Sequence, residues 1–210
     1  MENLLIIGAG GYSKSVLDSV DIYNFNMCGF IDEFSDKSEH LGYPIIATKL
    51  EEIPDYKSYV YFIAIGNNVR RKRWYDKLTQ LGLRLVNIID RSAIISPRAR
   101  IGNGCFVGKL AIINACATLG DNCVVNTRAL LEHGSVVGNH VNVSTNVSIN
   151  GDVRVMDGCF VGSSSVIIGQ LTIGAWSTIG AGAVVIRDVE SGITVAGVPA
   201  KKIKDGAMLG

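Results

Sequence analysis

The chain has 210 residues, of which 48% are hydrophobic and 19% charged, and its formal net charge at pH 7 is +1. This composition predicts a globular protein with a sizeable core, in one large domain or two small ones. The near-neutral charge gives no support for a nucleic-acid or membrane-surface partner, and no apolar run approaches the roughly 18 residues of a membrane helix.

The N-terminus lacks a signal-peptide pattern, because its short apolar run has no basic residues before it. The chain has five cysteines, an odd number. Together these features predict reduced thiols and a cytoplasmic protein.

The first ninety residues alternate strands with helical stretches, the pattern of a parallel sheet covered by helices. Strands are expected in NLLII (3–7), MCGFIDE (27–33), YVYFIAI (59–65) and RLVNIID (84–90). A helix is expected over 69–82, with Val69, Trp74, Leu78 and Leu81 on one side. The run from Arg70 to Arg73 is interpreted as a solvated face of that helix, with a contact to a bound phosphate as the alternative.

Glycines occupy the turn after the first strand, at Gly8, Gly10 and Gly11. Without side chains there, a phosphate can approach the backbone and the start of the following helix. The full GxGxxG fingerprint would require glycine where Ser13 stands. A simple tight turn is therefore an equal alternative on this feature alone.

Other strand ends favour a ligand across this edge of the sheet. Asp32 ends the second strand, where an acidic residue commonly binds a ribose hydroxyl. Gly66 and Asn67 follow the third strand, and the carboxyl ends of parallel strands share one edge. These positions predict a nucleotide site.

From residue 95, every sixth position is aliphatic, and the position two residues earlier is mostly small and never charged. Side chains alternate along a strand, so both registers face one side. This pattern predicts a hexapeptide-repeat parallel β-helix. Cys105, Cys123 and Cys159 then fill one interior stack as small hydrophobes. The aliphatic register runs through Ile95, Ile101, Val107, Ile113, Leu119, Val125, Leu131, Val137, Val143, Ile149, Val155, Val161, Ile167, Ile173, Ile179 and Val185.

The repeats resemble those of the hexapeptide-repeat family, which implies triangular coils of 18 residues with a left-handed sense. Glu132 and His133 follow an interior leucine and are expected at an outer corner, with Gly151 one coil further on. A histidine base beside a backbone N–H suits acyl transfer, since the base takes a proton and the N–H supports an oxyanion. The alternative is an exposed corner histidine without a role.

Six stretches extend the resemblance over nearly the whole chain: IIGAGGYSKSVLD (6–18), GFIDE (29–33), FIAIGNN (62–68), SAIISPRARIG (92–102), NTRALLEH (126–133) and AGVPAKKI (196–203). In this order the chain resembles the sugar acetyltransferase family that includes NeuD-type sialic acid O-acetyltransferases and PglD-type N-acetyltransferases for UDP-4-amino-sugars. The resemblance implies a Rossmann-like α/β domain over 1–90, a left-handed parallel β-helix over 91–195 and a GVPAK segment over 196–210. It also implies acetyl-CoA as donor, a nucleotide-linked sugar as acceptor and a homotrimer with active sites between subunits.

The resemblance assigns roles by position. His133 matches the general base and Gly151 the backbone donor, with Glu132 beside them. Gly10, Gly11 and Tyr12 match the sugar-nucleotide turn, Asp32 and Glu33 the acidic pair, Gly66 the turn near the sugar, and Asn126 falls near the acceptor. Asn142, Ser163 and Ala181 match the coenzyme groove, and Lys201 belongs to the GVPAK lid. No metal is expected.

Three positions depart from the family pattern: Tyr12, Gly134 and Asn142 stand where PglD-type relatives carry histidine, glutamate and histidine. The missing glutamate leaves open what orients His133, because Glu132 precedes it. His140 is interpreted as a surface residue at another corner, with a position lining the coenzyme groove as the alternative.

We expect N-acetylation of a nucleotide-linked amino-sugar in surface-glycan biosynthesis, with His133 as general base. The alternatives are O-acetylation of sialic acid or its nucleotide-activated form, and a non-catalytic trimeric nucleotide-binding scaffold. A zinc hydratase resembling γ-type carbonic anhydrases would need three histidines, whereas the repeats contain two, His133 and His140.

Overall fold

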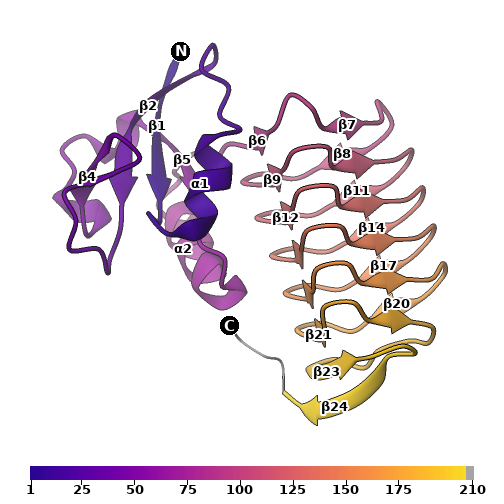
Figure 1. Cartoon of the computed structure of the whole chain (residues 1–210). Helices are drawn as coiled ribbons and strands as arrows, with labels where there is room; N and C mark the ends of the chain where they lie inside the picture. Colours follow the sequence, from indigo (N-terminus) through magenta and orange to yellow (C-terminus); the bar gives the residue numbers. More distant parts are fainter. Residues whose placement is uncertain (207–210) are drawn as a thin grey trace.

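The structure, a computed structural model, describes residues 1–206 as an α/β unit beside a triangular β-helix (Figure 1). The last four residues of the expected C-terminal segment, 207–210, lie outside the described residues. Within residues 1–206, no helix is long and apolar enough to cross a membrane.

The α/β unit is built on a five-stranded sheet of order β3-β4-β2-β1-β5. β1, β2, β4 and β5 run parallel, and β3 adds an antiparallel edge. The strands are β1 (Glu2–Ile7), β2 (Phe25–Ile31), β3 (Glu39–His40), β4 (Tyr43–Ala47) and β5 (Val60–Ile63). The helices are α1 (Gly11–Leu17) and α2 (Asn68–Gln80), with 3-10 turns at Leu50–Glu52 and Tyr56–Ser58.

Side chains alternate along these strands, so the sheet supplies two separate cores. Leu5 and Ile7 pack with Trp74 and Leu78 of α2. Leu4 and Ile6 belong to a second cluster that includes Phe106 and Val124 of the β-helix. The α/β unit is therefore joined to the β-helix by a shared apolar core.

The β-helix has three sheets, one on each side of its triangular coils. The covered sheet faces the α/β unit (Figure 1) and comprises β6 (Ile88–Ile89), β9 (Phe106–Val107), β12 (Val124–Val125), β15 (Asn142–Val143), β18 (Phe160–Val161), β21 (Thr178–Ile179), β23 (Ile193–Ala196) and β24 (Lys201–Asp205). β24 closes it as an antiparallel strand.

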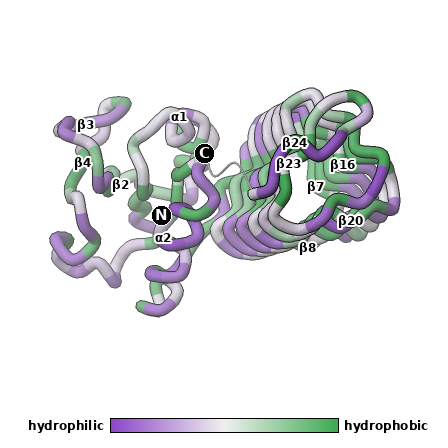
Figure 2. Tube along the Cα trace, turned by 90° about the horizontal axis from the view of Figure 1, so that it is seen from below, coloured by the Kyte–Doolittle hydropathy of each residue, from purple (hydrophilic) through white to green (hydrophobic). Residues whose placement is uncertain are grey.

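The other two sheets differ in their outward side chains, which are mostly apolar on one sheet and mostly polar on the other. The apolar sheet comprises β7 (Ile94–Ile95), β10 (Ile112–Ile113), β13 (Leu130–Leu131), β16 (Ser148–Ile149), β19 (Val166–Ile167) and β22 (Val184–Val185). The polar sheet comprises β8 (Arg100–Ile101), β11 (Thr118–Leu119), β14 (Val136–Val137), β17 (Arg154–Val155) and β20 (Thr172–Ile173). Figure 2, which looks along the stack of coils, shows hydrophobic colouring near β7 and β16 and hydrophilic colouring near β8 and β20.

The strand register confirms the expected 18-residue coil, because Ile113 pairs with Leu131 and Leu131 pairs with Ile149. The predicted interior positions form one cluster, in which only Ala93, Ile95, Ala99, Ile101 and Leu171 are partly exposed. Cys105, Cys123 and Cys159 are buried in it as predicted. The expected fold class, an α/β unit followed by a left-handed parallel β-helix, is confirmed.

Two expectations for the first half are wrong. The strand expected over 84–90 does not complete the first sheet, because Ile88–Ile89 pairs with β9 and only Leu85 bridges Tyr61. Ile89 stands six residues before Ile95, so the repeat already includes it. On α2, Val69 and Leu81 are exposed, and the buried face instead consists of Asn68, Arg71, Trp74 and Leu78.

Candidate active site

A cavity of about 200 Å³ opens at the carboxyl ends of β1, β2 and β5. It brings together all but one of the residues predicted to bind the acceptor: Gly8, Gly10, Gly11, Tyr12, Asp32, Glu33, Gly66 and Asn67. The exception is Asn126, which lies on the β-helix. The parallel sheet explains this convergence, since its strand ends share one edge.

The glycines of the cavity serve two purposes. Gly8 has a φ of +99°, and a Cβ there would lie 3.0 Å from the carbonyl oxygen of Ala64, so the close approach of β1 to β5 requires glycine. At Gly10, Gly11 and Gly66 a Cβ would meet nothing within 4 Å. Their missing side chains leave open space, which fits a ligand that needs close access to backbone.

The side chains of Asp32 and Asn67 accept hydrogen bonds from the backbone segments that line this cavity. The Asp32 carboxylate accepts hydrogen bonds from the N–H groups of Ala9 (2.6 Å), Phe34 (2.9 Å) and Ser35 (3.1 Å). The Asn67 side chain accepts from the N–H of Arg70 at 2.9 Å and caps α2. Glu33 is exposed and its carboxylate has no bond to a residue in the described part of the chain, so it is the freer acceptor for a ligand hydroxyl.

The Tyr12 hydroxyl is buried toward the β-helix. Its ring packs edge-on against Phe106, with centroids 5.5 Å apart, and the hydroxyl has no hydrogen-bond partner among residues 1–206. Burial raises the pKa of Tyr12 above its usual value. The uncharged Tyr12 side chain therefore separates the cavity from the covered sheet.

Sequence reasoning did not assign Phe34 or Trp74 to the cavity, and it favoured a solvated face for Arg70 over a contact with phosphate. Phe34 is 74% exposed, and the Arg70 guanidinium carbon lies 4.4 Å from the centroid of its ring. Phe34 follows the predicted acidic pair directly, and Arg70 lies three residues after Asn67, so proximity to predicted residues was the available signal.

Arg71 was expected on a solvated face, but it is buried, with only 1% of the residue exposed. Its guanidinium donates to the carbonyl oxygens of Ile65 (3.2 Å), Gly66 (3.1 Å), Asn122 (3.1 Å) and His140 (2.9 Å), and to the Asn68 side chain (2.9 Å). It thus ties the Gly66 turn to the β-helix. Its spacing of three residues from Trp74 and seven from Leu78 was the signal for burial.

The interpretation of His140 as a surface residue is also wrong. The side chain is 7% exposed, its Nδ1 lies 2.9 Å from Nδ2 of Asn122, and its ring packs edge-on against Tyr75. Burial lowers the pKa of His140. We interpret it as a neutral residue of the junction between the two halves.

His133 lies at the corner between β13 of the apolar sheet and β14 of the polar sheet. Its imidazole lies directly over Gly151, where a Cβ would be 2.7 Å from the ring Nε2. Position 151 must therefore be glycine for this ring placement. Neither the imidazole nor the Gly151 N–H has a hydrogen-bond partner within residues 1–206, so both are available to a ligand.

Glu132 does not orient the imidazole. Its carboxylate accepts a hydrogen bond from the backbone N–H of His133 at 3.1 Å and makes no bond to the ring. The reason is local, because neighbouring residues of an extended segment point in different directions.

The expected coenzyme-groove residues, and Asn126, which was expected near the acceptor, lie across the apolar sheet from His133. Asn126, Ser163 and Ala181 follow β12, β18 and β21, at the corner that joins the covered and apolar sheets, and Asn142 lies on β15. Ser163 and Ala181 are exposed, whereas Asn142 is buried and bonds Ser144 at 2.8 Å. Lys201 is exposed on β24. A single chain therefore does not bring His133 together with these residues.

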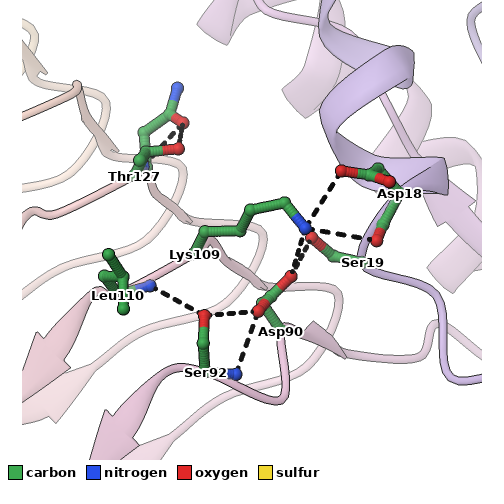
Figure 3. A network of polar contacts seen from close by, with 8 residues as sticks. Asp18, Ser19, Asp90, Ser92, Lys109, Leu110 and Thr127 are labelled. Carbon is green, nitrogen blue, oxygen red and sulfur yellow. Dashed lines mark hydrogen bonds and ion pairs between the residues drawn. The ribbon is translucent and has the colours of Figure 1, made fainter.

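A polar network at the same corner joins α1 to the first coils, which sequence reasoning did not predict (Figure 3). Lys109 Nζ lies 3.0 Å from Asp18 and 3.2 Å from Asp90. Asp90 also accepts from the Ser19 hydroxyl (2.7 Å) and from Ser92. Burial tends to raise the pKa of Asp90, but these hydrogen bonds outweigh it and hold the pKa well below its usual range.

Both halves of the chain match known protein families. Residues 3–78 match the PglD N-terminal domain, and residues 152–187 match the bacterial transferase hexapeptide model of six repeats. The UDP-N-acetylbacillosamine N-acetyltransferase of Bacillus subtilis is 35% identical over 114 residues, covering 51% of each chain. The chain spans about half the length of that relative and 20% of a matching, uncharacterised mimivirus protein.

Solved structures match over almost the full length. The acetyltransferase domain of PglB from Neisseria gonorrhoeae is 32% identical with a TM-score of 0.91, covering 97% of this chain and 100% of that one. Perosamine N-acetyltransferase from Caulobacter crescentus, in complex with CoA and GDP-perosamine, is 32% identical with a TM-score of 0.89, covering 97% of both chains. The chain belongs to the family of hexapeptide-repeat sugar N-acetyltransferases that carry a PglD-type N-terminal domain.

Proposed function

We propose that this protein transfers the acetyl group of acetyl-CoA to the amino group of a nucleotide-linked sugar, with His133 as the general base. The observation that carries the proposal is the placement of a free imidazole over Gly151 with an unengaged backbone N–H beside it. The family supports it, because the Caulobacter and Bacillus relatives act on amino-sugars. An amine is thereby favoured over the hydroxyl of a sialic acid.

The reaction needs a base, an oxyanion donor and a positioned acceptor. His133 takes a proton from the sugar amine as its nitrogen attacks the thioester carbonyl carbon. The Gly151 N–H supports the negative charge that develops on the carbonyl oxygen. The C–S bond then breaks, the CoA sulfur leaves as a thiolate that takes up a proton, and the products are the N-acetyl sugar and CoA.

The nucleotide of the acceptor is assigned to the cavity at the strand ends of the α/β unit. Gly10, Gly11 and Gly66 offer open backbone to the phosphates, and Glu33 offers a free carboxylate to ribose. Phe34 presents an exposed ring suited to stacking on a base. Lys201, together with Ser163 and Ala181, is assigned to the coenzyme.

We further propose a homotrimer that pairs the His133 corner of one chain with the nucleotide cavity of a neighbour. Within one chain the α/β unit packs on the covered sheet (Figure 1). His133 lies between β13 and β14, at the corner opposite that sheet. The apolar sheet lies between the covered sheet and the His133 corner. Its outward-facing residues form a row that is aliphatic except for one serine: Ile94, Ile112, Leu130, Ser148, Val166 and Val184. Such a row suits burial against further copies of the chain.

Packing three apolar sheets around a common axis gives a closed assembly. Each His133 corner then meets the neighbour's corner that carries Asn126, Ser163 and Ala181. Acetyl-CoA would lie in the groove between the two corners, beside the neighbour's α/β unit. The proposed location is the cytoplasm, where unpaired cysteines such as those of this chain are kept reduced.

The test of the activity is a CoA thiol-release assay with acetyl-CoA and a panel of 4-amino-sugar nucleotides and sialic acids. We expect release with at least one amino-sugar nucleotide. The His133→Ala variant should lose about 10²-fold in turnover while it keeps its melting temperature, because the ring is not part of a packed core. In the Caulobacter enzyme, variants in which one histidine is replaced were crystallised with CoA and GDP-perosamine, so both molecules still bind to those variants. Near-full activity of His133→Ala would refute the assignment.

A further inference from the structure

At the corner that carries His133, two side chains lie side by side in opposite directions. The His133 ring reaches from its coil onto Gly151 of the next coil. The carboxylate of Asp152, the next residue, reaches back onto Gly134, where a Cβ would overlap its Oδ1. The main chain fixes the pair, because the Asp152 N–H donates to the His133 carbonyl at 3.0 Å.

Each of these side chains depends on a glycine opposite to it. Gly134 has a φ of +67°, and its missing side chain leaves the space that the Asp152 carboxylate occupies. The missing side chain of Gly151 likewise leaves the space that the His133 imidazole occupies. Since His133 and Gly134 are consecutive, as are Gly151 and Asp152, the carboxylate and the imidazole are neighbours along the corner, although no hydrogen bond or ion pair joins them.

Aspartates at other corners have a structural function that Asp152 lacks. Side-chain Oδ1 atoms of Asp121, Asn139 and Asp157 also lie over glycines, but each accepts the N–H of the residue after that glycine, at 2.8 Å. At the His133 corner that N–H belongs to Ser135 and donates to the Glu132 carbonyl instead. The Asp152 carboxylate has no hydrogen bond or ion pair with any residue among 1–206.

We propose that Asp152 is the positioning residue of His133: a rotation of its side chain brings the carboxylate to the imidazole, where it holds the ring in orientation and stabilises the imidazolium that forms when the base takes the acceptor's proton. This inference rests on the proposed function. A carboxylate paired with a histidine base favours the protonated imidazole that proton transfer produces. Asp152 does not contact the substrate in this role; it acts through His133.

Two other titratable groups surround the imidazole. The Glu132 carboxylate accepts a hydrogen bond from the backbone N–H of His133 and makes no bond to the ring. The Cys116 thiol is exposed one coil earlier at the same corner. Asp152 is therefore the acidic group at this corner that is free to act on the ring.

The experiment is the pH dependence of kcat/KM for the sugar nucleotide at saturating acetyl-CoA, in wild type, Asp152→Asn, Asp152→Glu and Asp157→Asn. The acceptor amine titrates equally in the assays of all four proteins, so differences between their pH profiles arise from the enzyme's general base. In Asp152→Asn we expect the plateau to fall about 10-fold and the midpoint of the acid limb to move to lower pH by about half a unit or more. The KM for acetyl-CoA and the melting temperature should not change.

Asp152→Glu should recover part of the lost rate, because it restores a carboxylate. Asp157→Asn keeps an oxygen acceptor for Asn139 and should behave as wild type. A wild-type pH profile for Asp152→Asn, with His133→Ala inactive, would overturn this inference and leave the proposed function standing. A loss of rate without movement of the acid limb would also overturn it, since that result indicates a structural role. An active His133→Ala would instead refute the proposed function itself.

Discussion

The guanidinium of Arg71 donates a 2.9 Å hydrogen bond to the carbonyl oxygen of His140, which connects α2 of the α/β unit to a corner of the β-helix. The same guanidinium holds the carbonyls of Ile65 and Gly66 at the nucleotide cavity. One buried cation thus sets the position of a binding turn relative to the β-helix. Burial lowers the pKa of Arg71, and its hydrogen bonds to carbonyl and amide oxygens compensate for the missing carboxylate partner.

Replacing Arg71 by methionine should destabilise the protein by about 3–5 kcal/mol, because it leaves several buried carbonyl oxygens without donors. The KM for the sugar nucleotide should rise, since the Gly66 turn loses two of its bonds. Urea unfolding and steady-state kinetics measure the two effects. Arg73→Met, an exposed position two residues on, is the matched control and should change stability by less than about 0.5 kcal/mol. Equal stability of the two variants would contradict the assignment.

The apolar sheet provides a test of assembly. Leu130→Glu places a charge in the centre of its outward row and should convert the proposed trimer to monomers, because a buried unpaired carboxylate opposes packing of apolar surfaces. The variant should remain folded, since the interior of the coil is unchanged, but it should lose turnover. Analytical ultracentrifugation and the thiol-release assay measure these outcomes. Thr172→Glu on the polar sheet serves as control and should stay trimeric; an active monomer of either variant would refute a site shared between chains.

The Asp90 network predicts a pH dependence of stability. Its folded-state pKa lies below the unfolded value of about 3.9. Its stabilisation is therefore fully present above that value and is lost as the pH falls below it toward the folded-state pKa. The urea midpoint of the wild type should fall steeply below about pH 4. The Asp90→Asn variant should be less stable than wild type at pH 7, and its urea midpoint should change less with pH. In the Asp18→Asn variant, whose substituted side chain is exposed, the urea midpoint should depend on pH as it does in the wild type. Parallel curves for wild type and Asp90→Asn would contradict this.

Much of the candidate site could be predicted from the sequence. The cavity residues were found because strand ends of a parallel sheet converge on one edge, so Gly8, Asp32 and Gly66 had to lie together. The neighbour relation between His133 and Gly151 followed from the coil length that the resemblance implied. Phe34 was missed and a solvated face was favoured for Arg70, because no periodic signal distinguishes a residue of a cavity wall from a solvated one.

The six-residue period by itself determined the β-helix, its interior register and the burial of Cys105, Cys123 and Cys159, since one repeating alternation of side chains is enough to define a core. Only the tertiary structure decided how the two halves meet, which buried Arg71 and His140 against each other and drew Ile88–Ile89 into the β-helix. It also showed that the Asp152 carboxylate lies over Gly134, at the corner that carries His133. Such contacts depend on side chains reaching between coils and between the two halves, and a repeat period carries no information about that reach.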